Sequence, residues 1–395
     1  MTSPKRVMIV AWGSRGDLQP VASLALGLKK AGRDVLVFAT PPATDLIQAN
    51  GIDCVVAKEN VAEFVENMFG RADLSDRSIR GLIKLANFAR EYLNSPDYVA
   101  TQKADMKNAL ATAQNFKPDV LVVPNLIYGP FMCIAEALQI PVVTFDLQVN
   151  HPTSEFPLFT MEVGRVPKFL NRSLYTIKAF VYPKTIKPKF DMMREICGLP
   201  LDTYTDGSRF KVWPHNLPQT CAVSPSLCPQ PADWPAQKFM SGWWFLSGGS
   251  DYTPPPELVD FLKHRPVYIG FGSMKGNPEF CKMLSTLAIK SLQLAGIRAG
   301  CPTIVCATQG DQPFHGSIAQ ARGIGRYLGM VGSPKLTAES IAAGIKEVTT
   351  DQAIVATART LGEQVRAEDG VANAISFIYK MATSFSYPWP IKNEP

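Results

Sequence analysis

The chain has 395 residues, of which 46% are apolar and 19% are charged. Such a length predicts two α/β domains, and such a composition excludes wholesale disorder. Lys and Arg number 40 against 34 Asp and Glu, a net charge of +6 that is not concentrated in a basic stripe. We therefore expect no nucleic-acid partner.

The cysteines and the apolar runs of the sequence indicate the cellular compartment in which the protein is expected. The eight cysteines are scattered, with no CxxC motif and no cluster with histidines, so we expect reduced core thiols and no metal site. Between Arg6 and Gly13 stand only six apolar residues, too few for a signal-peptide core or a membrane span. We expect a cytoplasmic protein that touches membranes at most from the side.

The first part of the chain alternates apolar runs with helical patterns. An apolar run at 7–11 predicts a strand, which ends in a Gly-rich turn and is followed by helical spacing. Further strands are expected at 34–40, 54–57, 119–125 and 141–146, with helices between them. Strands that alternate with helices predict a parallel, doubly wound sheet.

Residues 151–215 lose this alternation and are rich in proline, basic and aromatic residues. Two interpretations of the basic and aromatic stretch 165–194 stay open: an amphipathic helical insertion with solvated charges, or a peripheral contact with a membrane surface. Residues 216–256 contain eight prolines and a Gly-Ser turn, which predicts an interdomain linker. We expect an N-terminal domain over 1–215 and a C-terminal domain over 257–385.

The C-terminal domain opens with an apolar strand at 266–274, and a helix over about 278–299 leads to a strand at 302–307. A helix then runs from Asp311 to Arg322 and is followed by a short turn-rich segment. The closing helices are expected at 335–350, 353–367 and 374–385.

Asp17 makes the first turn unusual. The preceding GSRG lacks the G-x-G-x-x-G spacing of a dinucleotide site, so we expect no NAD. Asp17 follows the carboxyl end of a strand, where ligands bind in open α/β sheets, and there it could accept a proton. It could equally cap a helix that begins near Pro20. The residues alone leave both roles open.

Long motifs in the chain resemble those of one family. They are GSRGDLQP at 13–20, SGWWF at 241–245, GFGSM at 270–274, AGCPTIVCATQGDQPFHG at 299–316 and LGEQVRAEDGVANAI at 361–375. The chain resembles sterol 3-beta-glucosyltransferases over nearly its whole length. The resemblance implies a GT-B fold of two Rossmann-like domains, the first for the acceptor and the second for a nucleotide sugar. It also implies inverting transfer of glucose from UDP-glucose to a sterol 3-hydroxyl, without a metal or cofactor.

The resemblance implies roles for the first turn. Asp17 matches the general base that deprotonates the acceptor hydroxyl, a role that suits a carboxylate. Gly13, Ser14, Arg15 and Gly16 match the N-terminal loop beside it.

The resemblance also implies a donor site. Gly272 and Ser273 match the turn that faces the nucleotide diphosphate, and Asp311 and Gln312 match the pair that binds the sugar hydroxyls. Asp311 could cap a helix as well. His315 stands where the family more often has Trp, so we expect no ligand contact from it.

One family element is missing from the sequence. The family's His-His-Gly-Gly-Ala-Gly-Thr-Thr run, whose backbone N–H groups hold the diphosphate, should precede the strand at 302–307, and it is absent around Arg298–Cys301. We therefore expect a shortened C-terminal domain and weak catalysis or none. The alternatives are a non-catalytic lipid-binding, sterol-binding or regulatory paralogue, and a transferase that acts on another natural-product aglycone.

Overall fold

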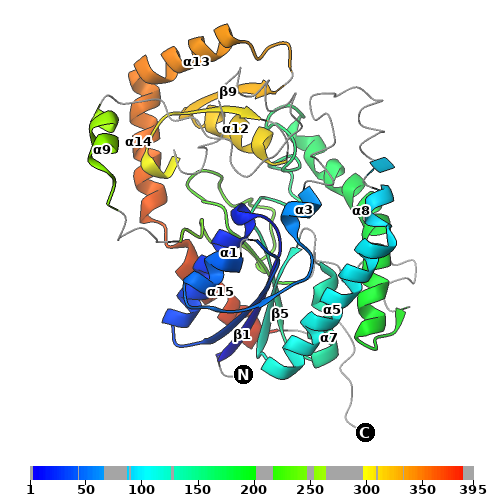
Figure 1. Cartoon of the computed structure of the whole chain (residues 1–395). Helices are drawn as coiled ribbons and strands as arrows, with labels where there is room; N and C mark the ends of the chain where they lie inside the picture. Colours follow the sequence, from blue (N-terminus) through cyan, green and yellow to red (C-terminus); the bar gives the residue numbers. More distant parts are fainter. Residues whose placement is uncertain are drawn as a thin grey trace.

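The computed structural model describes residues 3–42, 44–65, 87–88, 90–125, 129–201, 217–246, 253–263, 297–307, 310–331 and 333–385. Within these residues the chain forms a seven-stranded sheet and a two-stranded sheet. Figure 1 shows the larger sheet in the lower part of the molecule, between helices, and the smaller sheet in the upper part.

The larger sheet has the order β3-β2-β1-β4-β5-β6-β7, and every neighbouring pair is parallel. Its strands are β1 (Arg6–Ala11), β2 (Asp34–Ala39), β3 (Asp53–Val56), β4 (Val120–Pro124), β5 (Val142–Asp146), β6 (Gln219–Cys221) and β7 (Lys238–Met240). Most residues of the central strands are buried, because helices cover both faces of the sheet. The predicted parallel, doubly wound sheet is confirmed.

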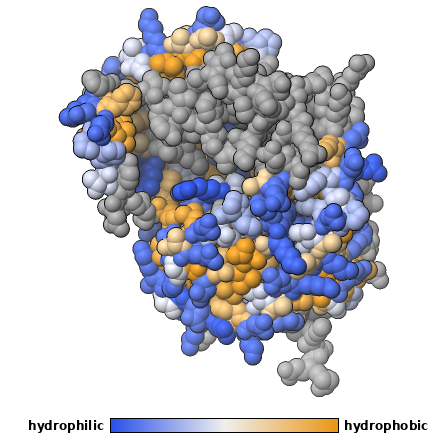
Figure 2. Space-filling view, in the orientation of Figure 1, coloured by the Kyte–Doolittle hydropathy of each residue, from blue (hydrophilic) through white to orange (hydrophobic). Residues whose placement is uncertain are grey.

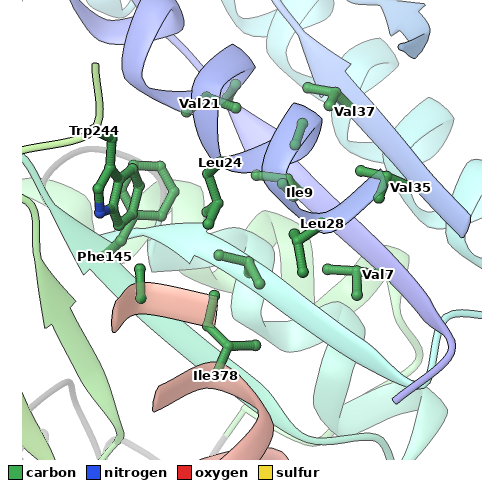
Figure 3. Packing of buried hydrophobic residues seen from close by; sticks show 14 of the residues in the cluster. Val7, Ile9, Val21, Leu24, Leu28, Val35, Val37, Phe145, Trp244 and Ile378 are labelled. Atoms are coloured by element: carbon green, nitrogen blue, oxygen red, sulfur yellow. The ribbon is translucent and has the colours of Figure 1, made fainter. Parts of the chain in front are cut away.

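Side chains of β1 alternate between two cores. Met8 and Val10 pack with α5 (Pro96–Phe116), α7 (Met132–Leu138) and α8 (Lys168–Ile196). Val7 and Ile9 pack with α1 (Arg15–Lys30) and α15 (Gly370–Thr383). Figure 3 shows the second core, where Ile378 lies near the residues of β1 and α1. The last helix of the chain therefore covers the first sheet.

Three short elements complete the first part of the chain. They are α2 (Thr44–Ala49), α3 (Val61–Val65) and the 3-10 helix η2 (Gly129–Phe131). The helix α8 spans most of 165–194, as the amphipathic interpretation predicted. Two strands, β6 and β7, lie within the stretch expected as a linker, and they extend the first sheet. Both are only three residues long, too short for an alternating pattern to reveal them.

The seven-stranded sheet and the helices that cover it form the first body of the molecule, and the two-stranded sheet and its helices form a second, smaller body. It contains β8 (Thr303–Ala307), β9 (Gly325–Met330), α9 (Pro256–Lys263), α12 (Gln312–Ala321), α13 (Ala338–Thr350) and α14 (Gln352–Ala367). The strand β9 occupies the segment expected to be turn-rich, so that expectation was wrong. The strand was missed because Gly325 and Gly329 interrupt its apolar pattern. At Gly325 the backbone of Thr303 occupies the space of a side chain, and Gly329 has φ +102°.

The helix α9 leaves its apolar side chains in solvent. Leu258, Val259, Phe261 and Leu262 are all exposed, and the helix has no buried residue. In Figure 2 it lies at the left edge, with hydrophobic residues at the surface beside hydrophilic ones. Such an uncovered apolar row is what we expect where a domain has lost sheet from its centre.

A third core joins the two bodies. The second body contributes Phe314 and Ile318 of α12 and Leu361 of α14. These side chains pack with Met240 and Trp243 of the first body. In the part of the chain that the structure describes, no helix is both long and apolar enough to cross a membrane. The cytoplasmic location stays a prediction, as does the division into domains.

Candidate active site

A cleft of about 860 Å³ lies where the two bodies meet. The first body lines it with the start of α1, the residues after β5 and the segment 243–245, and the second body with residues around α12 and α14. The lining residues are Ser14, Gly16, Asp17, Gln19, Pro20, Leu147, Gln148, Ala222, Trp243, Trp244, Phe245, Arg298, Ala299, Asp311, His315 and Arg366. The cleft therefore brings Asp17 and Asp311, expected at the acceptor and donor ends, into one space.

Asp17 is fixed by the first turn of α1. The backbone N–H of Ser14 donates to Oδ2 of Asp17 at 2.8 Å, and the Ser14 hydroxyl donates to the same oxygen at 3.2 Å. Asp17 thus binds the N-cap residue of the helix, a capping interaction, and it also lines the cleft.

Burial raises the pKa of Asp17, and the negative charge of Asp311 raises it further, while the hydrogen bonds from Ser14 act in the opposite direction. A carboxylate with a raised pKa holds a proton more strongly and is the better general base. The site therefore gives Asp17 the property that proton abstraction from a hydroxyl needs.

Gly13 makes room for this carboxylate. Its φ is +131°, and a Cβ built on Gly13 would lie 2.2 Å from Oδ2 of Asp17. The Gly13 N–H donates to Oγ1 of Thr40, at the end of β2, at 3.1 Å. Any side chain at position 13 would occupy the place of the Asp17 carboxylate.

The helix α1 begins earlier than expected. Arg15 and Gly16 are already helical, and Pro20 lies inside the helix, so the expected start near Pro20 was wrong. The capping interaction between Ser14 and Asp17 starts the helix before the apolar spacing begins, which periodicity alone does not show. Gly16 lines the cleft, whereas Arg15 is not among the described residues that do.

Asp311 stands at the N-cap position of α12, but its side chain makes no capping hydrogen bond. Its Oδ2 instead lies 3.4 Å from Nε2 of His315 and accepts a hydrogen bond from Nε2 of Gln148 at 3.4 Å. Burial alone would raise the pKa of Asp311, but the hydrogen bond and charge of His315 bring it below its ordinary value. Asp311 is therefore a carboxylate, an acceptor suited to sugar hydroxyls.

Sequence reasoning set aside His315, which the structure places in the cleft. The side chain is 5% exposed, and its ring lies edge-on to Phe314 with centroids 5.6 Å apart. Its Nδ1 is buried without a hydrogen-bond partner among the described residues. The signal was its spacing: the side chain four residues after the start of a helix lies beside that start.

Gln148 was also missed. It follows β5 and reaches Asp311 across the junction of the two bodies. Its place at the carboxyl end of a strand was the available signal.

The other residues expected at the donor site either do not line the cleft or lie outside the described residues. Gln312 is the first residue of α12 and is not among the described residues that line the cleft. Gly272 and Ser273 lie outside the described residues.

Known proteins are similar in sequence to this chain over nearly all of its length. Sterol 3-beta-glucosyltransferases of Penicillium rubens and Aspergillus fumigatus are each 27% identical to it, in alignments that cover 95% of this chain. The chain is homologous to sterol 3-beta-glucosyltransferases. It spans 30% of the length of these relatives. No protein-family model matches the chain.

The relatives also differ from this chain in length within the aligned region. The alignment with the Penicillium sterol glucosyltransferase extends over 447 positions, more than the 395 residues of this chain. The relative therefore has residues within the aligned region that this chain lacks. Such a difference in length is what the missing family run predicts.

Solved structures show the fold. The calicheamicin glycosyltransferase CalG4 has a TM-score of 0.61 and 14% identity, over 98% of this chain and 100% of its own. The glycosyltransferase of kitacinnamycin has a TM-score of 0.57 and 16% identity, over 96% of this chain and 99% of its own. The fold is the GT-B fold of glycosyltransferases, as expected.

The absence of a metal stays a prediction. No group of three or more His, Cys, Asp or Glu side chains that could hold a metal ion occurs within the described ranges. None of the seven described cysteines forms a disulfide.

Proposed function

We propose that the chain is a slow inverting hexosyltransferase that transfers glucose from UDP-glucose to the 3-hydroxyl of a sterol. The observation that carries this proposal is that Asp17 and Asp311 line one cleft. A base for the acceptor and a carboxylate for the donor sugar must lie close together for a single transfer step. Homology to sterol 3-beta-glucosyltransferases supports the choice of donor and acceptor.

In the proposed reaction Asp17 takes the proton of the acceptor hydroxyl while the oxygen of that hydroxyl bonds to the anomeric carbon. The bond from that carbon to the diphosphate breaks, and its electron pair leaves with UDP. Attack from the side opposite to UDP inverts the anomeric centre. Asp311 accepts hydrogen bonds from the sugar hydroxyls and so holds the anomeric carbon toward the acceptor.

The low rate follows from the run missing from the sequence. Backbone N–H groups at a helix N-terminus stabilise the charge that builds on a departing diphosphate. The loss of one such donor typically costs about 3–4 kcal/mol in the transition state. We therefore expect this chain to be slower than relatives that contain the run.

The proposal is tested by incubating the chain with UDP-glucose and a sterol and detecting steryl glucoside by mass spectrometry. Parallel reactions with natural-product aglycones test the alternative acceptor class. A chain that forms glucosides of the aglycones and none of the sterol would overturn the acceptor assignment alone.

The missing run also favours a second candidate, a non-catalytic protein that binds a sterol or another lipid. Calorimetry separates the two. Heat from a UDP-glucose titration supports the enzyme, whereas sterol or vesicle binding without any response to UDP-glucose supports the binding protein.

Asp311→Asn should raise the KM for UDP-glucose by roughly tenfold and change kcat less, because the amide replaces one accepting oxygen by a donor. Steady-state kinetics with varied UDP-glucose measures this. Asp351→Asn is the matched control: Asp351 is also an N-cap residue, it caps α14 through Ala353 and Ile354, and it is not among the described residues of the cleft. Equal KM values for wild type and Asp311→Asn would remove Asp311 from the donor site.

We further propose that α8 contacts membranes through its apolar side chains. Leu170 and Ile177, seven residues apart on one helical face, are 41% and 61% exposed, and Phe169 beside them is 78% exposed. Ile177→Ser should weaken co-sedimentation with anionic lipid vesicles by several-fold, since such binding scales with the apolar area that a helix buries in the membrane interface. Thr176→Ser, one residue away, is the control. Equal sedimentation of Ile177→Ser and wild type would leave α8 a solvated insertion.

A further inference from the structure

Two arginines from the second body line the cleft. Arg298 precedes β8, and Arg366 lies in the last turn of α14. The Arg366 guanidinium donates through Nη1 to the backbone carbonyl of Arg298. The Arg298 guanidinium lies over the ring of Phe245, 4.2 Å from its centroid. The backbone carbonyl and the ring therefore orient two guanidinium groups at one side of the cleft.

Neither arginine has an acidic partner among the residues that the structure describes. The cleft's two carboxylates are engaged elsewhere: Asp17 binds Ser14, and Asp311 binds His315 and Gln148. Positive groups that converge on a cleft without carboxylate partners are a site for an anion.

A nucleotide sugar matches this distribution of charge. Its diphosphate is anionic and its sugar carries hydroxyl groups, while the cleft offers two guanidinium groups and two carboxylates. A guanidinium group has a planar fork of donors that fits phosphate oxygens in pairs. The donors that the sequence lacks, the backbone N–H groups of the missing run, would have served the same diphosphate.

We propose that Arg298 and Arg366 bind the diphosphate of a nucleoside diphosphate sugar, in place of the missing backbone donors. This inference rests on the proposed function. It names the groups that receive the leaving UDP in a chain without the family's Gly-rich run. It also accounts for how such a chain keeps a donor site.

Calorimetric titration with UDP, uridine and inorganic pyrophosphate tests the inference. Wild type should bind UDP more tightly than uridine, and it should bind pyrophosphate. Arg298→Gln and Arg366→Gln should each weaken UDP binding by about tenfold or more and leave uridine binding unchanged, because a charge-assisted pair is lost. Arg298→Lys should recover part of the affinity, because it restores the charge without the fork.

Arg359→Gln is the matched control. Arg359 lies on α14, as Arg366 does, and pairs with Glu363 at the surface. It is not among the described residues that line the cleft. It should bind UDP as wild type does. Thermal unfolding of each variant shows that it is folded before titration.

The outcomes separate the two proposals. UDP binding that stays equal in wild type and both Gln variants overturns the arginine site and leaves the proposed function standing. The arginine site is likewise overturned if Arg359→Gln loses as much affinity as the cleft variants. A wild type that binds neither UDP nor pyrophosphate and forms no glucoside overturns both.

Discussion

Asp17→Asn is expected to reduce glucosyl transfer by about 10²–10⁴-fold, the range that a positioned general base supplies. The amide keeps an oxygen that can accept the Ser14 N–H, so the first turn of α1 should survive the change. What it loses is the capacity to take up a proton. Single-turnover formation of steryl glucoside measures the chemical step directly.

Two controls separate catalysis from folding. Asp97→Asn changes another acidic residue in the first turn of a helix, exposed on α5, and should leave the rate unchanged. Because the pKa of Asp17 is raised in the folded state, its ionised form costs stability as pH rises through that raised value. Asp17→Asn should therefore be no less stable than wild type at neutral pH. A folded Asp17→Asn that keeps the wild-type rate would contradict the catalytic role.

The rate should also depend on pH through Asp17. Only the ionised carboxylate can accept the proton, so kcat/KM should fall as pH decreases through the raised pKa, at a pH above that of an ordinary aspartate. A profile that stays flat to the ordinary range of aspartate would show that Asp17 is not the base.

Gly13→Ala is expected to reduce transfer by about 100-fold, because displacing a catalytic group by about 1 Å can cost that much. The new Cβ would stand 2.2 Å from Oδ2 of Asp17, so the carboxylate must move. The substitution also forces a side chain onto a backbone with φ +131°, which costs about 1–3 kcal/mol of stability. Enzyme kinetics and chemical denaturation measure the two effects.

Gly32→Ala is the control that isolates the backbone. Gly32 follows α1, has φ +74° and has no atom within 4 Å of a built Cβ. It should lose stability, as any residue forced into this region does, and keep its rate. If Gly13→Ala keeps the wild-type rate, the position of Asp17 is not set by the space at Gly13.

The first sheet could be predicted because its strands are continuous apolar runs that helices cover on both faces. The strand β1 and the residues around Asp17 illustrate this, since both follow from a run that ends in a Gly-rich turn. The strands β6 and β7 could not be predicted because each has only three residues, and β9 could not because glycines interrupt it.

The candidate site was predictable in its two carboxylates and in Ser14 and Gly16 of the first turn, which also line the cleft. Asp17 and Asp311 stand in long motifs, and the structure brings them to one cleft. Arg298 and Arg366 could not be foreseen, since their role depends on which side chains the packing of the two bodies leaves without an acidic partner. The raised pKa of Asp17 likewise depends on burial and on Asp311, which lies far from it in sequence.

The central claim is that this cleft still transfers a sugar although the family's diphosphate-binding run is absent from the sequence. The most direct test is a prolonged incubation of the 395-residue chain with isotopically labelled UDP-glucose and a sterol, with Asp17→Asn in parallel. The account predicts slow, time-dependent labelling of steryl glucoside by wild type and none above background by the variant. Equal labelling by both, or none by either, would contradict it.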